Sequence, residues 1–348
     1  MKLGNKTLSI PLIQGGMGVG ISLGNLAGNV AKCGAMGVIS SVNAGFSEPD
    51  FNTATVDANL RALRREIKKA KDISGGNGLV GVNIMTAVTH YEETCRCAVE
   101  AGADAIISGA GLPKSLAEYV QGSDTLFAPI VSSGRAAKLL LRHYEKRYNT
   151  RPDFIVIEGS RAGGHLGFSK EELLENTALS NEEILRETLE VTGDIPLFVG
   201  GGVFDGHDMA ALCKAGASGV QIGTRFIATE ECDAADGFKQ AIINASEDDI
   251  MIITSPVGMP ARALKSPLLE RLSSGDKFTA ISCNNCLSAC PKGDKTPYCI
   301  SRALVEAVQG NWEDGLFFTG ANAGRINKIL KVKDLIDEIM EDYERDLA

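Results

Sequence analysis

Apolar, strand-like runs alternate with amphipathic helical patterns over the first 250 residues, and this alternation constrains the fold more than any other feature. Nearly continuous apolar strands that are each followed by a helix are typical of a parallel sheet covered by helices. Eight such strand–helix units predict a closed (β/α)8 TIM barrel rather than an open sheet. The predicted strands are Ser9–Gln14, Met36–Ser40, Leu79–Ile84, Asp104–Ser108, Leu126–Ser132, Phe154–Glu158, Ile195–Val199 and Ser218–Ile222. The predicted helices are Ser22–Cys33, Thr55–Lys71, Val88–Ala101, Lys114–Gln121, Arg135–Arg147, Asn181–Val191, Gly206–Ala215 and Asp233–Ala245.

The composition changes after about residue 250. A loop with Pro and Arg, SPVGMPARAL (Ser255–Leu264), precedes a cysteine-rich segment, and a charged helical tail, Val332–Leu347, closes the chain. One face of the tail is apolar, so we expect it to pack on the barrel. The sequence therefore divides into a barrel over residues 1–250 and a C-terminal extension over residues 251–348, which we expect to form a small lid or subdomain.

Charge and hydropathy narrow the classes of partner. The net charge is −9, and no basic run is present, which argues against nucleic acid. No segment approaches the roughly 20 apolar residues of a membrane helix, and the N-terminus lacks the apolar core of a signal peptide. We expect a cytoplasmic protein that acts on a small-molecule substrate without a membrane partner, with a homodimer as its assembly.

One glycine-rich loop carries a histidine directly after the sixth predicted strand. The stretch FIVIEGSRAGGHLGF (Phe154–Phe168) places Gly163, Gly164 and Gly167 around His165. Glycine lets a backbone approach a ligand closely, and imidazole moves protons readily near pH 7. These residues predict a catalytic loop, with a surface loop and an incidental histidine as the alternative. Glu158, at the end of the strand, is either an orienting partner or a buried, hydrogen-bonded carboxylate.

Two further glycine loops follow the seventh and eighth predicted strands, where barrels most often bind phosphate. VGGGVF contains Gly200, Gly201 and Gly202, and VQIGTRF contains Gly223 and Thr224. Backbone N–H groups of the first loop can face an anion, and the helix that begins at the second adds its dipole. The pair predicts a phosphate site; the alternative is that these glycines only form tight turns.

Four of the nine cysteines form the pattern C-x2-C-x3-C-x8-C, namely Cys283, Cys286, Cys290 and Cys299. Four thiolates within such a short loop are typical of a metal or cluster site. A 4Fe–4S cluster, a structural zinc ion, and free thiols or disulfides are the three interpretations. We expect the other five cysteines, which lie in helical patterns, to be packing residues.

Taken together, the motifs resemble a known family. PLIQGGMGVGIS, GVNIM, EGSRAGGHLG and the run GGGVFDGHDMAALCKAGASGVQIGTRFIATEE are similar to the nitronate monooxygenase (2-nitropropane dioxygenase) family. Flavin-dependent enoyl-ACP reductases are similar and share the fold, and SPVGMPARAL and GLFFTGANAG resemble that branch in particular. The resemblance covers residues 8 to 325. The cysteine spacing resembles the iron–sulfur segment of 2,4-dienoyl-CoA reductase-type flavoenzymes, which the best-known nitronate monooxygenases lack.

The resemblance implies FMN in the mouth of the barrel and His165 as the active-site histidine. It places Gly15, Gly16 and Met17 beside the flavin ring and Asn83 within hydrogen-bonding reach of the ring or ribityl chain. Gly163 and Gly164 flank the cofactor in the histidine loop, while Gly201, Gly202, Gly223 and Thr224 hold the phosphate. The flavin carries the redox chemistry, and the protein positions it.

Three activities follow from this assignment. Oxidation of nitronates or nitroalkanes, with His165 as the proton-transfer residue, is the first, because AGGHLG matches that branch best. The alternative is reduction of an activated alkene such as enoyl-ACP, with NAD(P)H as co-substrate. A redox-sensing or electron-carrying protein, in which flavin and cluster exchange electrons, is a third.

Overall fold

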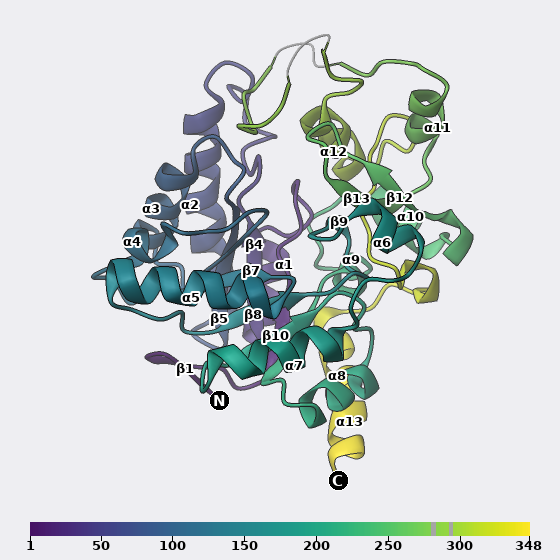
Figure 1. Cartoon of the computed structure of the whole chain (residues 1–348). Coiled ribbons are helices and arrows are strands. Elements are labelled where there is room, and N and C mark those ends of the chain that lie inside the picture. Colours follow the sequence, from purple (N-terminus) through teal and green to yellow (C-terminus); the bar gives the residue numbers. More distant parts are fainter. Residues whose placement is uncertain (280–282, 292–294) are drawn as a thin grey trace.

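The barrel is the centre of the computed structural model, which describes residues 1–279, 283–291 and 295–348 (Figure 1). Parallel strands close in the order β10-β11-β3-β4-β5-β6-β7-β8, which confirms the predicted (β/α)8 TIM barrel. The barrel strands are β3 (Leu12–Gln14), β4 (Met36–Ser40), β5 (Leu79–Met85), β6 (Ala105–Gly109), β7 (Leu126–Val131), β8 (Ile155–Glu158), β10 (Leu197–Gly200) and β11 (Gly219–Ile222).

Apolar side chains fill both faces of the barrel strands, because successive residues of a strand point to opposite sides. Ile13, Val156 and Phe198 belong to the cluster inside the barrel, whereas their neighbours Leu12 and Val199 pack against the surrounding helices. The continuous apolar runs in the sequence therefore reflect burial on both sides, as expected for a parallel sheet.

The covering helices agree with the predicted ones to within a few residues at each end. They are α1 (Gly24–Lys32), α2 (Thr55–Ser74), α3 (Tyr91–Glu100), α4 (Leu116–Val120), α5 (Gly134–Tyr148), α7 (Asn181–Thr192), α8 (Gly206–Lys214) and α10 (Asp236–Ile243). Side-chain caps fix several starts: Ser133 accepts from the N–H of Ala136 at α5, and Asp205 accepts from that of Asp208 at α8. Such caps satisfy backbone donors that the first turn of a helix leaves free.

Two regular parts of the extension contact the barrel or its loops. Its strands β12 (Ile250–Thr254) and β13 (Pro260–Leu264) form a three-stranded antiparallel sheet with β9 (Gly164–His165), which belongs to the histidine loop. The terminal helix α13 (Val332–Leu347) packs against α8 and α1, as the apolar face of the tail predicted (Figure 1). The division of the chain at residue 250 remains a prediction.

The remaining short elements complete the chain. They are the hairpin β1 (Lys2–Leu3) and β2 (Lys6–Thr7), α6 (Lys170–Leu174), α9 (Thr224–Ile227), η1 (Glu247–Asp249), α11 (Pro267–Ser273), α12 (Ile300–Val308) and η3 (Ala323–Arg325). Within the described part of the chain, no helix combines the length and the apolar character that crossing a membrane requires.

Candidate active site

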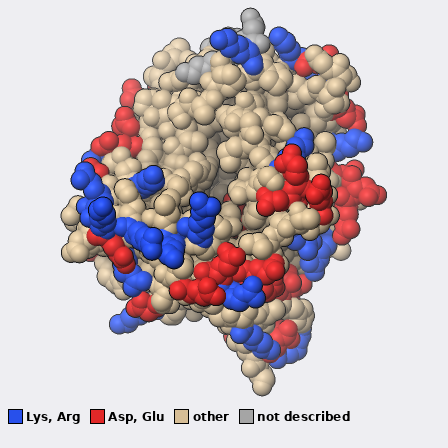
Figure 2. Space-filling model, in the orientation of Figure 1, with Lys and Arg blue, Asp and Glu red and all other residues tan. Residues whose placement is uncertain are grey.

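A cavity of about 650 Å³ opens at the C-terminal ends of the barrel strands. It is visible as the central hollow in Figure 2. Every residue predicted for the flavin site lines it: Gly15, Gly16, Met17, Asn83, Gly163, Gly164, His165, Gly201, Gly202, Gly223 and Thr224. These residues lie in or after five different barrel strands, so the closure of the barrel is what brings them together.

The rim of the hollow carries charge of both signs. Basic side chains over α5 lie on one side of it, and acidic side chains over α6 and α7 lie on its other sides (Figure 2). The exposed basic residues of α5 include Arg135, Lys138 and Arg142. The inner wall is made mostly of glycine, small polar and apolar residues. Charge at the rim and a largely neutral interior suit a ligand that enters from water and is then shielded from it.

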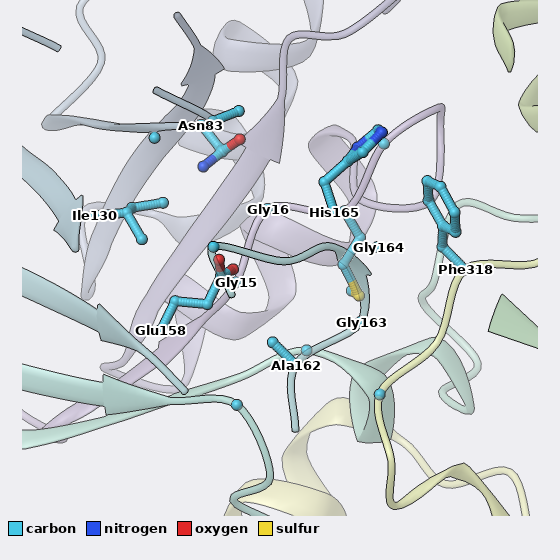
Figure 3. A pocket seen from close by; sticks show the side chains of 18 of the residues that line it. Gly15, Gly16, Asn83, Ile130, Glu158, Ala162, Gly163, Gly164, His165 and Phe318 are labelled. Carbon is cyan, nitrogen blue, oxygen red and sulfur yellow. The ribbon is translucent and has the colours of Figure 1, made fainter. Parts of the chain in front are cut away.

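His165 is fixed by the extension. Its backbone pairs with Ala261 of β13, and the next residue, Leu166, donates to the carbonyl of Pro260 at 2.9 Å. The imidazole lies 5.5 Å from the ring of Phe318, centroid to centroid (Figure 3). Its Nε2 atom is buried and has no hydrogen-bond partner in residues 1–279, 283–291 and 295–348. Burial lowers the pKa of His165, so the imidazole is neutral at pH 7.

Glu158 ends β8 and lines the same cavity. Figure 3 shows its carboxyl group, the Asn83 side chain and Ile130 pointing into one space. Burial raises the pKa of Glu158 to about 7. Neither role predicted for it is observed, because its carboxyl group is bonded neither to His165 nor to any other group that the structure describes. It is an isolated carboxyl group that gains or loses a proton near neutral pH.

Gly15 and Gly16, which were predicted to contact the flavin ring, have no space for a side chain. A Cβ on Gly16 would lie 2.4 Å from the Cβ of Asn83, and one on Gly15 would lie 3.2 Å from the side chain of Gln221. The N–H of Gly15 donates to the carbonyl of Ile222 at 2.9 Å, which ties the loop to β11. The backbone can therefore approach a flat ring closely beside Asn83.

The predicted phosphate loops line the same cavity. Gly201 and Gly202 have φ angles of +86° and +101°, which favour glycine, and a Cβ on Gly201 would lie 2.6 Å from the carbonyl oxygen of Gly159. The hydroxyl of Thr224 accepts a hydrogen bond from the N–H of Gly320 at 2.9 Å. The helix that begins at Thr224, α9, has only four residues, so its dipole contributes less than the sequence suggested.

Three further groups, which were not predicted from the sequence, lie beside these loops: the side chains of Arg161 and Asn322 and the backbone of Ala321. Arg161 lines the cavity and donates to Oδ1 of Asn322 at 3.1 Å, and Asn322 donates from Nδ2 to the carbonyl of Gly202 at 2.6 Å. The N–H of Ala321 donates to the carbonyl of Arg161 at 3.0 Å. Segment 319–322 of the extension therefore borders the cavity beside the predicted phosphate loops. Arg161 is the one cation in the loop EGSRAGGHLG, and that was the signal available in the sequence.

Arg262 of β13 forms hydrogen bonds with the backbone of the histidine loop. Its side chain is only 9% exposed, and its guanidinium donates to the carbonyls of Ser160, at 2.8 Å, and Ala162. Burial, with a smaller contribution from the charge of Arg161, lowers the pKa of Arg262 to about 10. The residue lies in the SPVGMPARAL segment, whose sequence carried no sign that it reaches this loop.

The cysteine segment lies at the edge of the cavity. Cys286 lines it, and burial raises the pKa of this thiol to about 11, with smaller contributions from Cys299, Cys290 and Cys283. All four thiols are free. Among the described residues, however, no three His, Cys, Asp or Glu side chains are gathered in a way that could hold a metal ion. The structure thus gives no support to the predicted 4Fe–4S or zinc site.

Comparisons with known proteins agree with this geometry. The sequence profile described as "Nitronate monooxygenase" matches residues 2–342. A Mycobacterium tuberculosis protein named "(3aS,4S,5R,7aS)-5-hydroxy-7a-methyl-1-oxo-octahydro-1H-indene-4-carboxyl-CoA dehydrogenase" is 27% identical over 362 aligned residues, covering 95% of this chain and 92% of that protein. A "Probable nitronate monooxygenase" of Staphylococcus saprophyticus is 32% identical over 124 residues, covering 36% of this chain and 35% of that protein.

Solved structures show the same architecture over nearly the whole chain. FabK from Thermotoga maritima superposes with a TM-score of 0.76 at 25% identity, covering 98% of this chain and 94% of that one. Nitroalkane oxidase from Streptomyces ansochromogenes superposes with a TM-score of 0.75 at 19% identity, covering 98% and 97%, and at that identity it shows the fold alone. Because the family profile spans the barrel, the histidine loop and the extension together, the chain belongs to the nitronate monooxygenase family and is a flavin-dependent oxidoreductase.

Proposed function

We propose that this chain binds FMN at the mouth of the barrel and oxidises nitronates or nitroalkanes, with His165 as the proton-transfer residue. The observation that carries the proposal is the buried, unpartnered Nε2 of His165 in the cavity, an atom for which the described residues supply no hydrogen bond. A buried polar atom without a partner is costly, and a ligand in this cavity would supply the missing contact.

The residues present fit FMN. Gly15, Gly16 and Asn83 would contact the flavin ring, where the narrow backbone leaves room for a flat group. Gly201, Gly202, Gly223 and Thr224 would hold the phosphate, at the end that Arg161 closes. When bound, the flavin supplies two-electron chemistry.

His165 acts on the carbon next to the nitro group. With its pKa lowered by burial, the neutral imidazole accepts the α-proton of a nitroalkane at Nε2. The sheet between β9 and β13 keeps the ring in place while the proton moves. The apolar neighbour Phe318 keeps water from the reacting atoms.

A second candidate is NAD(P)H-dependent reduction of an α,β-unsaturated thioester such as enoyl-ACP. The relative that aligns over 95% of this chain is by name a carboxyl-CoA dehydrogenase, whereas the probable nitronate monooxygenase aligns over 36%. Leu112 and Leu179 line the cavity and are 42% and 38% exposed, so an acyl chain would find apolar surface at the entrance. In this reaction His165 would polarise the substrate or return a proton.

Steady-state assays decide between these candidates. The purified chain, loaded with FMN, is supplied in parallel with a nitroalkane, its nitronate, and crotonyl thioesters with NADH or NADPH. Turnover of nitroalkane or nitronate supports the first assignment. Rapid NAD(P)H consumption with the thioester and no nitronate turnover contradicts it, and bound flavin with no turnover at all favours an electron-carrying role.

The four cysteines of the extension, Cys283, Cys286, Cys290 and Cys299, remain the candidate ligands of the predicted 4Fe–4S cluster or zinc ion. No step of the proposed reaction involves them. Metal analysis and an absorbance spectrum of protein purified without oxygen test this: iron and a broad shoulder beside the flavin bands indicate a cluster, and zinc alone indicates a structural site.

A further inference from the structure

Two arginines are neighbours at the histidine loop and have no acidic partner. Arg262 donates to the carbonyls of Ser160 and Ala162, the residues on either side of Arg161. Neither forms an ion pair with a carboxylate in the described part of the chain, although the net charge of the whole chain is −9. Their hydrogen bonds go to neutral oxygens, those of Asn322, Ser160 and Ala162. Two neighbouring cations without a counter-ion favour an anionic ligand.

The position of Arg161 indicates where that anion would lie. The side chain passes over Gly202, since a Cβ on this glycine would lie 2.9 Å from the Cβ and 3.2 Å from the Cδ of Arg161. Arg161 is exposed and lines the cavity, whereas Arg262 is 9% exposed and donates from Nη1 to two carbonyls of the loop. Of the two, only Arg161 lines the cavity, together with Gly202 and Thr224.

The same side chain joins the barrel to the extension. Arg161 donates to Asn322, Asn322 donates to Gly202, and the backbone of Ala321 donates to that of Arg161. Gly320 donates to Thr224. The bonds that dock segment 319–322 on the barrel are therefore made by the residues that surround the expected phosphate.

We propose that Arg161 is the cationic contact of the flavin phosphate, that it selects FMN over unphosphorylated riboflavin, and that phosphate binding thereby strengthens the docking of segment 319–322. This inference rests on the proposed FMN site. A guanidinium provides several donors in a fixed fork that matches phosphate oxygens. Arg161 can thus keep its bond to Asn322 and still donate to the ligand.

Flavin binding tests the proposal without turnover. The full-length chain is stripped of flavin, and dissociation constants for FMN and riboflavin are measured by flavin fluorescence. Arg161→Gln is expected to weaken FMN binding by about 10- to 100-fold, the range for loss of a charge-assisted hydrogen bond, with riboflavin changed less than about twofold. Arg161→Lys keeps the charge but loses the fork, so it should fall between.

Arg325→Gln is the matched control. Arg325 does not line the cavity: it pairs with Asp205 at 3.1 Å, and its guanidinium lies over the ring of Phe204, a residue of the lining. Its removal should leave the ratio of the two dissociation constants unchanged. Riboflavin binding in each variant also reports whether the barrel is folded.

Hydrogen exchange gives a second measurement. FMN, but not riboflavin, should slow exchange of the amides of Gly320 and Ala321 in the parent chain, and this difference should vanish in Arg161→Gln. Equal weakening of both flavins, or protection by riboflavin as strong as by FMN, overturns the inference and leaves the FMN site intact. If the parent chain binds neither flavin, the proposed function itself is wrong.

Discussion

His165 and Ala261 are paired across the antiparallel contact between β9 and β13, although almost a hundred positions separate them in the sequence. Ala261 is fully buried. The extension is thus part of the candidate site: it supplies the strand that pairs with the backbone of His165, and Phe318 beside the imidazole also comes from it. A barrel without residues 251–348 would present the histidine on an unsupported glycine loop.

Replacing His165 tests the proton-transfer role. In His165→Gln, turnover should fall by roughly 10²- to 10⁴-fold, the usual effect of losing a general acid or base. FMN should remain bound, because the proposed ring and phosphate contacts are made by residues other than His165. Absorbance of bound flavin and steady-state rates measure both quantities. His90→Gln, at an exposed position paired with Glu93, is the control; a His165 variant as active as that control would remove the histidine from the mechanism.

The pH dependence of nitroalkane oxidation follows from the same residue. Burial lowers the pKa of His165 below its ordinary value of 6.5. Only the neutral imidazole can accept a proton, so kcat/KM for a neutral nitroalkane should rise with pH through that lowered pKa and be level from about pH 7 upward. A preformed nitronate has no proton to give and should lack this rising limb. Persistence of the limb in His165→Gln would assign it to another group.

Glu158 predicts a pH dependence of stability. The pKa of its carboxyl group is about 7 in the folded chain, whereas a glutamate in water has an ordinary pKa of 4.5. Between these values the folded state keeps a proton that the unfolded state has lost, so stability falls as pH rises from 4.5 to 7 and is level above. Glu158→Gln resembles the protonated form and should remove this loss, gaining up to roughly 3 kcal/mol at about pH 8 and little at about pH 5.

Urea unfolding of the flavin-free chain at about pH 5 and about pH 8 measures that difference. Glu172→Gln serves as a control of opposite sign, because its carboxylate accepts from the N–H of Ser169 in a capping box and its pKa is lowered. That variant should be less stable than the parent by a similar amount at both pH values, because the lowered pKa of Glu172 lies below this range. If Glu158→Gln shows the same change at both pH values, Glu158 does not titrate in this range.

The barrel could be predicted from the sequence because its signals are local. Each strand is an apolar run followed by a segment that contains Gly, Ser, Asn or Thr, and each helix shows apolar residues at helical spacing. The sheet of β9, β12 and β13 could not, since β9 is two residues long, Gly164 and His165, and its partner lies far along the chain. Neither segment has a strand pattern without the other.

The candidate site likewise combines residues that could be identified from the sequence with residues that could not. Glycines that approach a ligand, and a histidine among them, are visible in the sequence. Arg161, Arg262 and segment 319–322 acquire their roles only when the extension folds back onto the barrel. The raised pKa of Glu158 likewise depends on burial, which no single residue in EGSRAGGHLG encodes.

Arg262 predicts a positioning effect that can be separated from a loss of folding. Its guanidinium satisfies the carbonyls of Ser160 and Ala162, just before Gly163 and His165. Arg262→Met removes both bonds and leaves buried acceptors unpaired, each costing about 1–3 kcal/mol, so thermal stability should fall.

Arg262→Lys keeps one donor and should retain most of the stability. Both bonds come from one nitrogen, Nη1, which the shorter lysine side chain cannot place at the same point. His165 should therefore be less well placed, and kcat should fall more than KM changes. In that variant the rising limb of the pH profile should also shift, since the burial of the imidazole changes. Loss of stability with unaltered kcat and pH profile in Arg262→Lys would mean that Arg262 supports the fold without positioning the histidine.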